Sequence, residues 1–167
     1  MEHQCESPGI LIDHLFKSHA AKSITKSTND LFTTLLWATL YGHYAVIKPL
    51  LDAGADLEAR GEESGQSPLI LAPKYGHVEI MKLLLNGGAN MESRDHFGGL
   101  PLMWAAENGH VEVMELLLNR GADIESQADN RKSPLMRAAG NGHVEVVELI
   151  LDKGLIWKLG MTMVIRH

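Results

Sequence analysis

Four histidines with regular spacing are the residues best placed to do chemistry in this chain of 167 residues. Each one follows a glycine, and they are His43, His77, His110 and His143. Histidine is a common metal ligand, so a shared metal site is one hypothesis. Zinc ligands must lie about 2.0–2.3 Å from the ion, however, whereas packed helices lie about 8–10 Å apart. We therefore expect each histidine to hydrogen-bond nearby backbone at a turn of its own.

The remaining reactive residues predict no catalytic site. Cys5 lies near the start of the sequence without a positioned base that would activate its thiol. Ser67 and Ser133 precede prolines and favour helix caps over nucleophiles. Glu112 and Glu115 fall on the polar side of an amphipathic segment, where solvated charge is the usual state. We expect no enzyme, no cofactor and no metal ion.

Composition limits the classes of partner. Apolar residues make up 45% and charged residues 22% of the chain, which is typical of a globular domain. The formal net charge of −6 argues against a nucleic-acid partner. A single cysteine excludes an intrachain disulfide and favours a reducing compartment, so we expect a cytoplasmic or nuclear protein. Neither a signal peptide nor a membrane-spanning stretch is predicted, and no membrane partner is expected.

The glycine–histidine pairs belong to a longer internal repeat. They recur at spacings of 34, 33 and 33 residues inside segments such as "SPLILAPKYGHVEIMKLLLNGGAN" and "LPLMWAAENGHVEVMELLLNRGAD". Serine and proline favour the start of a helix, and glycine favours its end. In the helix that follows, the spacing of Val111, Met114, Leu117 and Leu118 predicts one buried stripe. Each unit is therefore expected to form a helix, a turn, a second helix and an extended loop.

Such a unit cannot bury both of its faces alone, so neighbouring units must stack. A small residue recurs midway along each predicted first helix, at Ala38, Ala72, Ala105 and Ala138. Small side chains there let adjacent helices approach closely, as stacking requires.

This pattern resembles the ankyrin repeat family, whose motif is roughly D-x-x-G-x-T-P-L-H-x-A-A-x-x-G-H, followed by a helix ending L-L-x-x-G-A. The third copy fits best, from Asp95 and Gly98 through Pro101 and His110 to Gly121. The resemblance covers about residues 33–154. It implies an all-α solenoid of helix–turn–helix units that are joined by short β-hairpin loops, with the helices in two layers.

The repeat register divides the sequence into six parts. Residues 1–32 are predicted to be a degenerate N-terminal cap or partial repeat, in which Ile10, Leu11, Leu15 and Phe16 face inward. Repeats one, two and three are expected at residues 33–66, 67–99 and 100–132. Residues 133–154 are expected to be a truncated repeat four that ends at Gly154, and residues 155–167 an aberrant tail.

Several positions depart from the family motif. The family histidine of T-P-L-H is replaced by apolar residues that we expect to fill the core, namely Leu36, Ile70, Met103 and Met136. The hairpin glycine is kept at Gly65 and Gly98 but lost at Leu31 and Arg131, where a positive φ would be strained. Pro49 and Pro73 fall inside predicted helices, where each removes a hydrogen bond and costs about 3 kcal/mol.

The tail "LIWKLGMTMVIRH" has a possible origin in the reading frame. Tryptophan and methionine each have one codon, and both codons end in G. If one base is restored before Leu155, these bases force glutamate at position 158, aspartate at 162 and glycine at 164. All three match the repeat, and allowed codons elsewhere complete "GADMEARDDNGDTP". We expect residues 155–167 to be a frame-shifted fifth repeat. The alternative is a genuine cap in which Ile156, Leu159 and Val164 close the core.

The ankyrin resemblance implies a concave binding face made of hairpin tips and first helices. Carried onto this sequence, its candidate partner-binding residues are Trp37, Tyr41, Lys74, Tyr75, His96, Phe97, Trp104, Glu107, Asn108, Arg137 and Asn141. The alternative for Trp37 and Trp104 is that they pack against neighbouring repeats.

We expect a non-enzymatic module that binds a partner protein as a monomer, unless an apolar C-terminal end drives association. Two alternatives remain open. One is a truncated piece of a longer array with little function of its own. The other is a small inhibitor or adaptor of an enzyme such as a kinase.

Overall fold

The computed structural model describes residues 28–164, and at residues 28–30 and 155–164 it describes the backbone alone. This part of the chain is all-α, with no strand. Its helices are α3 (Thr28–Leu40), α4 (Tyr44–Asp52), α5 (Pro68–Tyr75), α6 (Val78–Asn86), α7 (Pro101–Glu107), α8 (Val111–Asn119), α9 (Pro134–Gly140) and α10 (Val144–Val164). The predicted N-terminal cap up to residue 27 and Cys5 lie outside the described residues.

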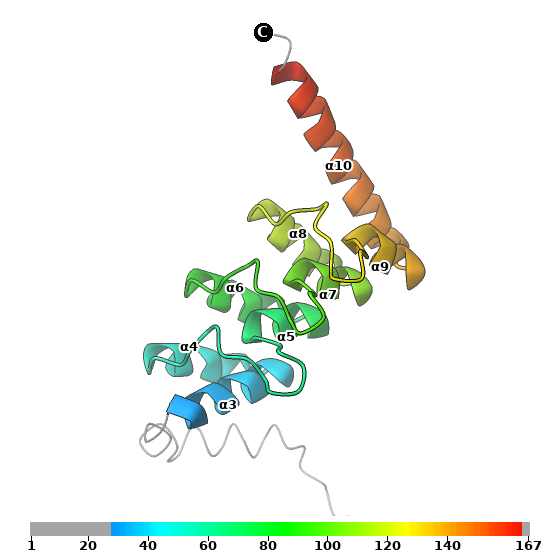
Figure 1. Cartoon of the computed structure of the whole chain (residues 1–167). Helices are drawn as coiled ribbons and strands as arrows, with labels where there is room; N and C mark the ends of the chain where they lie inside the picture. The colour runs from blue at the N-terminus through cyan, green and yellow to red at the C-terminus, as the bar shows by residue number, and fades with distance from the viewer. Residues whose placement is uncertain (1–27, 165–167) are drawn as a thin grey trace, which may run out of the picture.

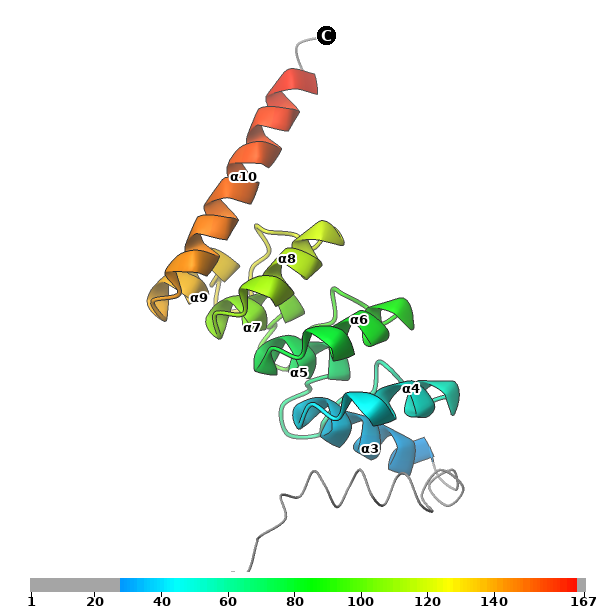
Figure 2. The ribbon, with the colours of Figure 1, turned by 180° about the vertical axis from the view of Figure 1, so that it is seen from behind.

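The helices stack in two layers, as predicted. Each repeat contributes one antiparallel pair, and the pairs follow one another along a single axis (Figures 1 and 2). In the first layer α3 contacts α5, α5 contacts α7, and α7 contacts α9. In the second layer α4 contacts α6 and α8 contacts α10. The all-α solenoid expected from the repeats is therefore confirmed.

Proline and serine start the first-layer helices. Proline occupies the first turn of α5, α7 and α9, where its missing N–H costs nothing. The Ser133 hydroxyl accepts a hydrogen bond from the Met136 N–H at 3.3 Å, which confirms the predicted cap. The prediction for Ser67 is wrong in detail. Ser67 is the N-cap residue of α5, but its buried hydroxyl lies 3.3 Å from that of Ser93 and caps nothing.

Small residues hold the first layer together. The four predicted alanines are all buried, with Ala38 at 3% exposure and the other three at zero. The stripe predicted on α8 needs correction, because Val113, Met114 and Leu117 are its buried residues while Val111 and Leu118 are only partly buried. Because α8 contacts both α7 and α10, its buried arc is wider than a single row of side chains.

The residues that replace the family histidine differ in how deeply they are buried. Ile70 and Met103 are fully buried, as predicted, and Leu36 is partly buried. The prediction for Met136 is wrong, because it is 60% exposed. Its helix, α9, has a first-layer neighbour on one side only within the described residues, so the second side of the helix stays open.

The loops that join consecutive repeats, between α4 and α5, α6 and α7, and α8 and α9, stand where hairpins were predicted, and we call them fingers. They are tight turns closed by backbone hydrogen bonds and contain no strand. The Asp95 N–H donates to the Gly99 carbonyl at 3.0 Å, and the Ala128 N–H donates to Lys132 at 3.2 Å. Gly98 has a φ of 70°, and Arg131 holds the matching position at 62°, so the expected strain at the lost glycine is present. Leu31, in contrast, does not lie in a hairpin. It is a buried residue within α3, which begins earlier than residue 33.

Two helices contain proline without ending there. Pro49 lies inside α4 and Pro73 inside α5, as predicted. The repeat boundary predicted at Gly154 is not the end of a helix, because α10 continues to Val164 and extends beyond the rest of the stack (Figures 1 and 2). Gly154 does not adopt the positive φ that would reverse the chain, so nothing at this position stops the helix. The side chains of Ile156, Leu159 and Val164 lie outside those that the structure describes.

Candidate protein-binding surface

Three positions of each repeat, on the first-layer helix or directly after its last residue, define a surface that we call the inner face. They lie three and four residues apart and therefore occupy the same side of a helix. The twelve residues, in repeat order, are Trp37, Leu71, Trp104 and Arg137; Leu40, Lys74, Glu107 and Gly140; and Tyr41, Tyr75, Asn108 and Asn141.

The N-terminal half of the inner face carries exposed aromatic rings. Trp37 is 51% exposed and stacks on Tyr41, with 5.2 Å between the ring centroids and 17° between the planes. Tyr41 is also exposed, and its ring lies 6.4 Å from that of His43. Tyr75 follows one repeat later, exposed as well, with its ring 6.3 Å from that of His77. Trp37 and Tyr41 stack on each other, Tyr75 contacts His77, and all three aromatic side chains remain exposed.

A small pocket opens beside Trp37. It has a volume of about 180 Å³. Its walls come from α3, α5 and the finger of repeat one, and the lining residues are Leu36, Trp37, Leu40, Gly61, Ser64, Gln66 and Leu71. Sequence reasoning missed this pocket because the finger residues approach α3 only through the fold of the loop. The pocket is large enough for one apolar side chain, and its rim carries a hydroxyl and an amide.

The C-terminal half of the inner face is already engaged within the protein. The indole Nε1 of Trp104 donates a hydrogen bond of 2.8 Å to the buried carboxylate of Asp95. The Lys74 ammonium lies 4.6 Å from the centroid of the Trp104 ring, and the Arg137 guanidinium carbon lies 5.6 Å from it. Cations this close to an indole ring are held by its electron-rich face. Trp104 therefore packs between repeats, while Trp37 does not.

Polar residues beside Trp104 also form bonds within the protein, although the buried Nε of Arg137 has no hydrogen-bond partner. Arg137 forms an ion pair with Glu107, and its side chain is only 9% exposed. The amide of Asn108 donates to the Trp104 carbonyl at 2.8 Å, and the amide of Asn141 donates to the Arg137 carbonyl at 3.0 Å. A partner that bound these groups would have to replace existing bonds.

The two predicted finger residues behave differently from each other. Phe97 is exposed at the tip of its finger. The His96 side chain instead packs on the preceding finger, since a Cβ placed on Gly65 would lie 2.2 Å from its ring. The His96 backbone N–H also donates to the Ser64 carbonyl at 3.1 Å. Phe97 alone of this pair presents an unengaged side chain.

The regularly spaced histidines join consecutive repeats. The Nε2 atoms of His77, His110 and His143 donate to carbonyls of the preceding repeat at 3.3, 3.2 and 2.9 Å. The expected backbone hydrogen bonds are therefore present, although they reach one repeat back and not to the local turn. Within residues 28–164, no three histidine, cysteine, aspartate or glutamate side chains gather in a way that could hold a metal ion.

The electrostatics of the second layer are separate from the inner face. On α6 the Lys82 ammonium donates to Glu79 at 2.5 Å, and this hydrogen bond raises the pKa of the lysine. Lys82 is solvent-exposed, so water screens the pair and we assign it no structural role.

Comparison with known families gives the assignment. The family described as "Ankyrin repeats (3 copies)" matches residues 35–128 and, in a second overlapping register, residues 69–159. The chain belongs to the ankyrin-repeat family. Comparison with curated proteins finds no match. Ankyrin repeats generally serve as protein–protein interaction modules and are typically non-enzymatic. Crossing a bilayer takes a long apolar helix, and the described part of this ankyrin-repeat protein contains none.

Proposed function

We propose that this ankyrin-repeat protein is a non-enzymatic module that binds a partner protein through the N-terminal half of its inner face. The observation that carries the proposal is the exposure of Trp37, Tyr41 and Tyr75 on neighbouring first-layer elements, with Trp37 and Tyr41 stacked on each other. Tryptophan and tyrosine dominate the energetics of protein interfaces, because a rigid ring buries a large area at low entropic cost. Exposed apolar area of this kind commonly marks an interaction site.

The pocket beside Trp37 defines the chemistry of the partner. Its floor is apolar, and it accommodates one apolar side chain. Ser64 also lines the pocket and can hydrogen-bond the partner, whereas the buried amide of Gln66 already accepts from Lys74 at 3.5 Å. We therefore expect the partner to present an apolar anchor residue, which inserts beside Trp37, on a segment that also covers Tyr41.

The C-terminal half of the inner face contributes less to this interface. Trp104, Arg137 and Glu107 already bond one another and their neighbours, so a partner gains little by contacting them. Asn108 and Asn141 are exposed, but their amides bond the helix backbone. Phe97, 68% exposed in the loop before α7, offers a further apolar side chain.

Site-specific photo-crosslinking tests this proposal in the full chain. A benzophenone amino acid replaces Tyr41 or Tyr75 in two variants, and Asn108 or Asn141 in two matched controls that occupy the same position of the repeat. Irradiation in cell extract should give a discrete crosslinked protein from positions 41 and 75. The same protein should be absent or much weaker at positions 108 and 141. Equal crosslinking from all four positions, or crosslinking from the controls alone, would contradict the proposal.

A further inference from the structure

The C-terminal face of repeat four exposes positions that are buried or partly buried in the preceding repeats. Met136 is 60% exposed, whereas its counterparts Met103 and Ile70 are at zero. Leu151 is 49% exposed, and Leu118 at the same position is partly buried. The difference lies in the neighbours, because the residues at these positions are apolar in all the repeats. We call this surface the terminal face.

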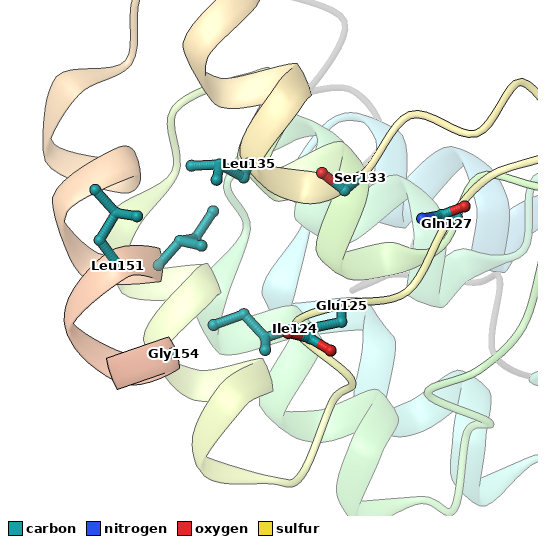
Figure 3. A pocket seen from close by; sticks show the side chains of 8 residues that line it. Ile124, Glu125, Gln127, Ser133, Leu135, Leu151 and Gly154 are labelled. Atoms are coloured by element: carbon teal, nitrogen blue, oxygen red, sulfur yellow. The ribbon is translucent and has the colours of Figure 1, made fainter. Parts of the chain in front are cut away.

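A pocket on the terminal face lies where a further helix pair would pack. It has a volume of about 440 Å³ and is lined by apolar side chains, with a polar rim from the last finger loop. Figure 3 shows Leu135 from α9, Leu151 from α10 and Ile124 from the loop after α8 around this space. Leu135 is partly buried, whereas its counterparts Leu102 and Leu69 are buried between repeats. The pocket is therefore the uncovered form of the interface that joins the interior repeats.

Gly142 has the same backbone conformation as two glycines that pack against a histidine ring of the next repeat. It has a φ of 77°, and Gly76 and Gly109 both have 74°. A Cβ placed on either of those two glycines would lie 2.8 or 2.5 Å from the histidine ring of the following repeat. A Cβ on Gly142 would meet no described atom within 4 Å, and a hollow of about 310 Å³ adjoins it. The turn histidines donate to the carbonyls of Leu40, Lys74 and Glu107. Gly140 occupies the same position in repeat four, so its carbonyl would accept from the histidine of a following repeat.

The reading frame supplies an independent observation. If one base is restored before Leu155, allowed codons let residues 155–167 read "ADMEARDDNGDTP", which aligns without a gap with "ADIESQADNRKSP" at 122–134. Three of these residues are forced by the single codons of tryptophan and methionine. Among them is the glycine at position 164, which stands where Gly98 adopts its positive φ. This match does not depend on the structure of the terminal face.

We propose that the terminal face is the seat of a fifth ankyrin repeat, which is encoded in the frame displaced by one base after Gly154. Its first helix packs on Met136 and Leu135 of α9, and its second helix covers Leu151 of α10. A histidine in its turn fits against Gly142. This occupant is favoured because it continues an interface that the chain already builds between each pair of repeats.

Thiol labelling tests the proposal on two versions of the full chain, both with Cys5→Ser and Met136→Cys. The first version is otherwise unchanged. In the second, "ADMEARDDNGDTP" and then a copy of residues 102–121 replace residues 155–167. Labelling of the thiol at position 136 should be at least about tenfold slower in the second version, because the site is exposed only when the added repeat opens. A matched pair with Glu112→Cys, on the exposed side of α8, should label at equal rates.

Each other outcome overturns the proposal. Equal labelling of the two Met136→Cys versions would show that the terminal face accepts no repeat. A protected thiol in the unchanged version would show another occupant, which sedimentation identifies as a second copy if the chain is a dimer, or as the chain's own end if it is a monomer. The gene gives a second test: a displaced frame that stops, or that encodes unrelated sequence beyond position 167, would also overturn it.

Discussion

Trp37 and Trp104 occupy the same position in repeats one and three, and the two surroundings differ in kind. Around Trp104, Asp95 binds the indole N–H while Lys74 and Arg137 lie beside the ring. For Trp37, the residues at the positions of Asp95 and Arg137, nine residues before it and one repeat after it, are Thr28 and Leu71, which offer neither a carboxylate nor a cation. The same side chain thus serves the stack in one repeat and remains open to a partner in the other.

This comparison shows how a repeat protein separates stability from recognition. The helix scaffold is nearly constant, with buried alanines at the same position in all four first-layer helices. Two substitutions in neighbouring elements then decide whether an aromatic ring is covered. The half of the inner face in which these polar neighbours are missing is therefore the half whose aromatic rings stay exposed.

The largest expected effect is a difference in protein stability between the alanine variants of the two tryptophans. Trp104→Ala should lower the free energy of unfolding by about 2–4 kcal/mol, because it removes packing and cation contacts and leaves the buried Asp95 without one donor. Trp37→Ala should cost less than about 1 kcal/mol, because half of that side chain is already in water. Urea unfolding followed by circular dichroism measures both. Equal losses would remove the distinction between the two halves.

The second largest expected effect is the loss of stability when the ion pair between Arg137 and Glu107 is broken. Glu107→Gln should destabilise the protein by about 1–2 kcal/mol, since it leaves the nearly buried Arg137 guanidinium without a counter-charge. Glu79→Gln, which breaks the exposed pair with Lys82, is the matched control and should leave the unfolding midpoint unchanged. If both substitutions shift the midpoint alike, the pair at Arg137 is a surface pair and not part of an internal network.

A single substitution should make the pocket beside Trp37 unfavourable for an apolar anchor. Gly61 lines this pocket, and a Cβ at Gly61 makes only ordinary contacts, the nearest at 3.8 Å. Gly61→Asp places a carboxylate in the pocket and should weaken partner binding about threefold to tenfold, because an apolar side chain would have to desolvate the charge. Gly61→Ala is the control. Titration calorimetry with the crosslinked partner measures the change, and unaltered affinity would mean that this pocket takes no part in recognition.

The smallest expected effect compares two residues one turn further along. Asn108→Ala should cost about 0.5–1 kcal/mol of stability, because its amide caps the Trp104 carbonyl at the end of α7. Tyr75→Ala, at the same position of repeat two, should leave stability nearly unchanged and weaken partner binding. Paired unfolding and binding measurements on the two variants check this. If Asn108→Ala weakened binding and Tyr75→Ala weakened stability, the binding surface would lie in the C-terminal half of the inner face.

The sequence was sufficient to predict the stack but not the state of its surface. Serine–proline starts, glycine stops and helical spacing are local signals, so the helix pairs and the buried alanines could be predicted directly. The cover over Trp104 comes from Asp95 and Arg137, which lie 9 and 33 residues away in sequence, and no local pattern specifies it. Met136 was misjudged for a related reason. Its burial depends on a following repeat and not on its own hydrophobicity.

The central claim is that a partner protein binds the aromatic half of the inner face, and its most direct test is a comparison of two double variants. The partner is the protein crosslinked at position 41, and its affinity is measured for the full chain, for Trp37→Ala with Tyr41→Ala, and for Asn108→Ala with Asn141→Ala. We predict at least about a tenfold loss for the aromatic pair and less than about a twofold change for the asparagine pair. Equal losses, or a larger loss from the asparagine pair, would contradict the account.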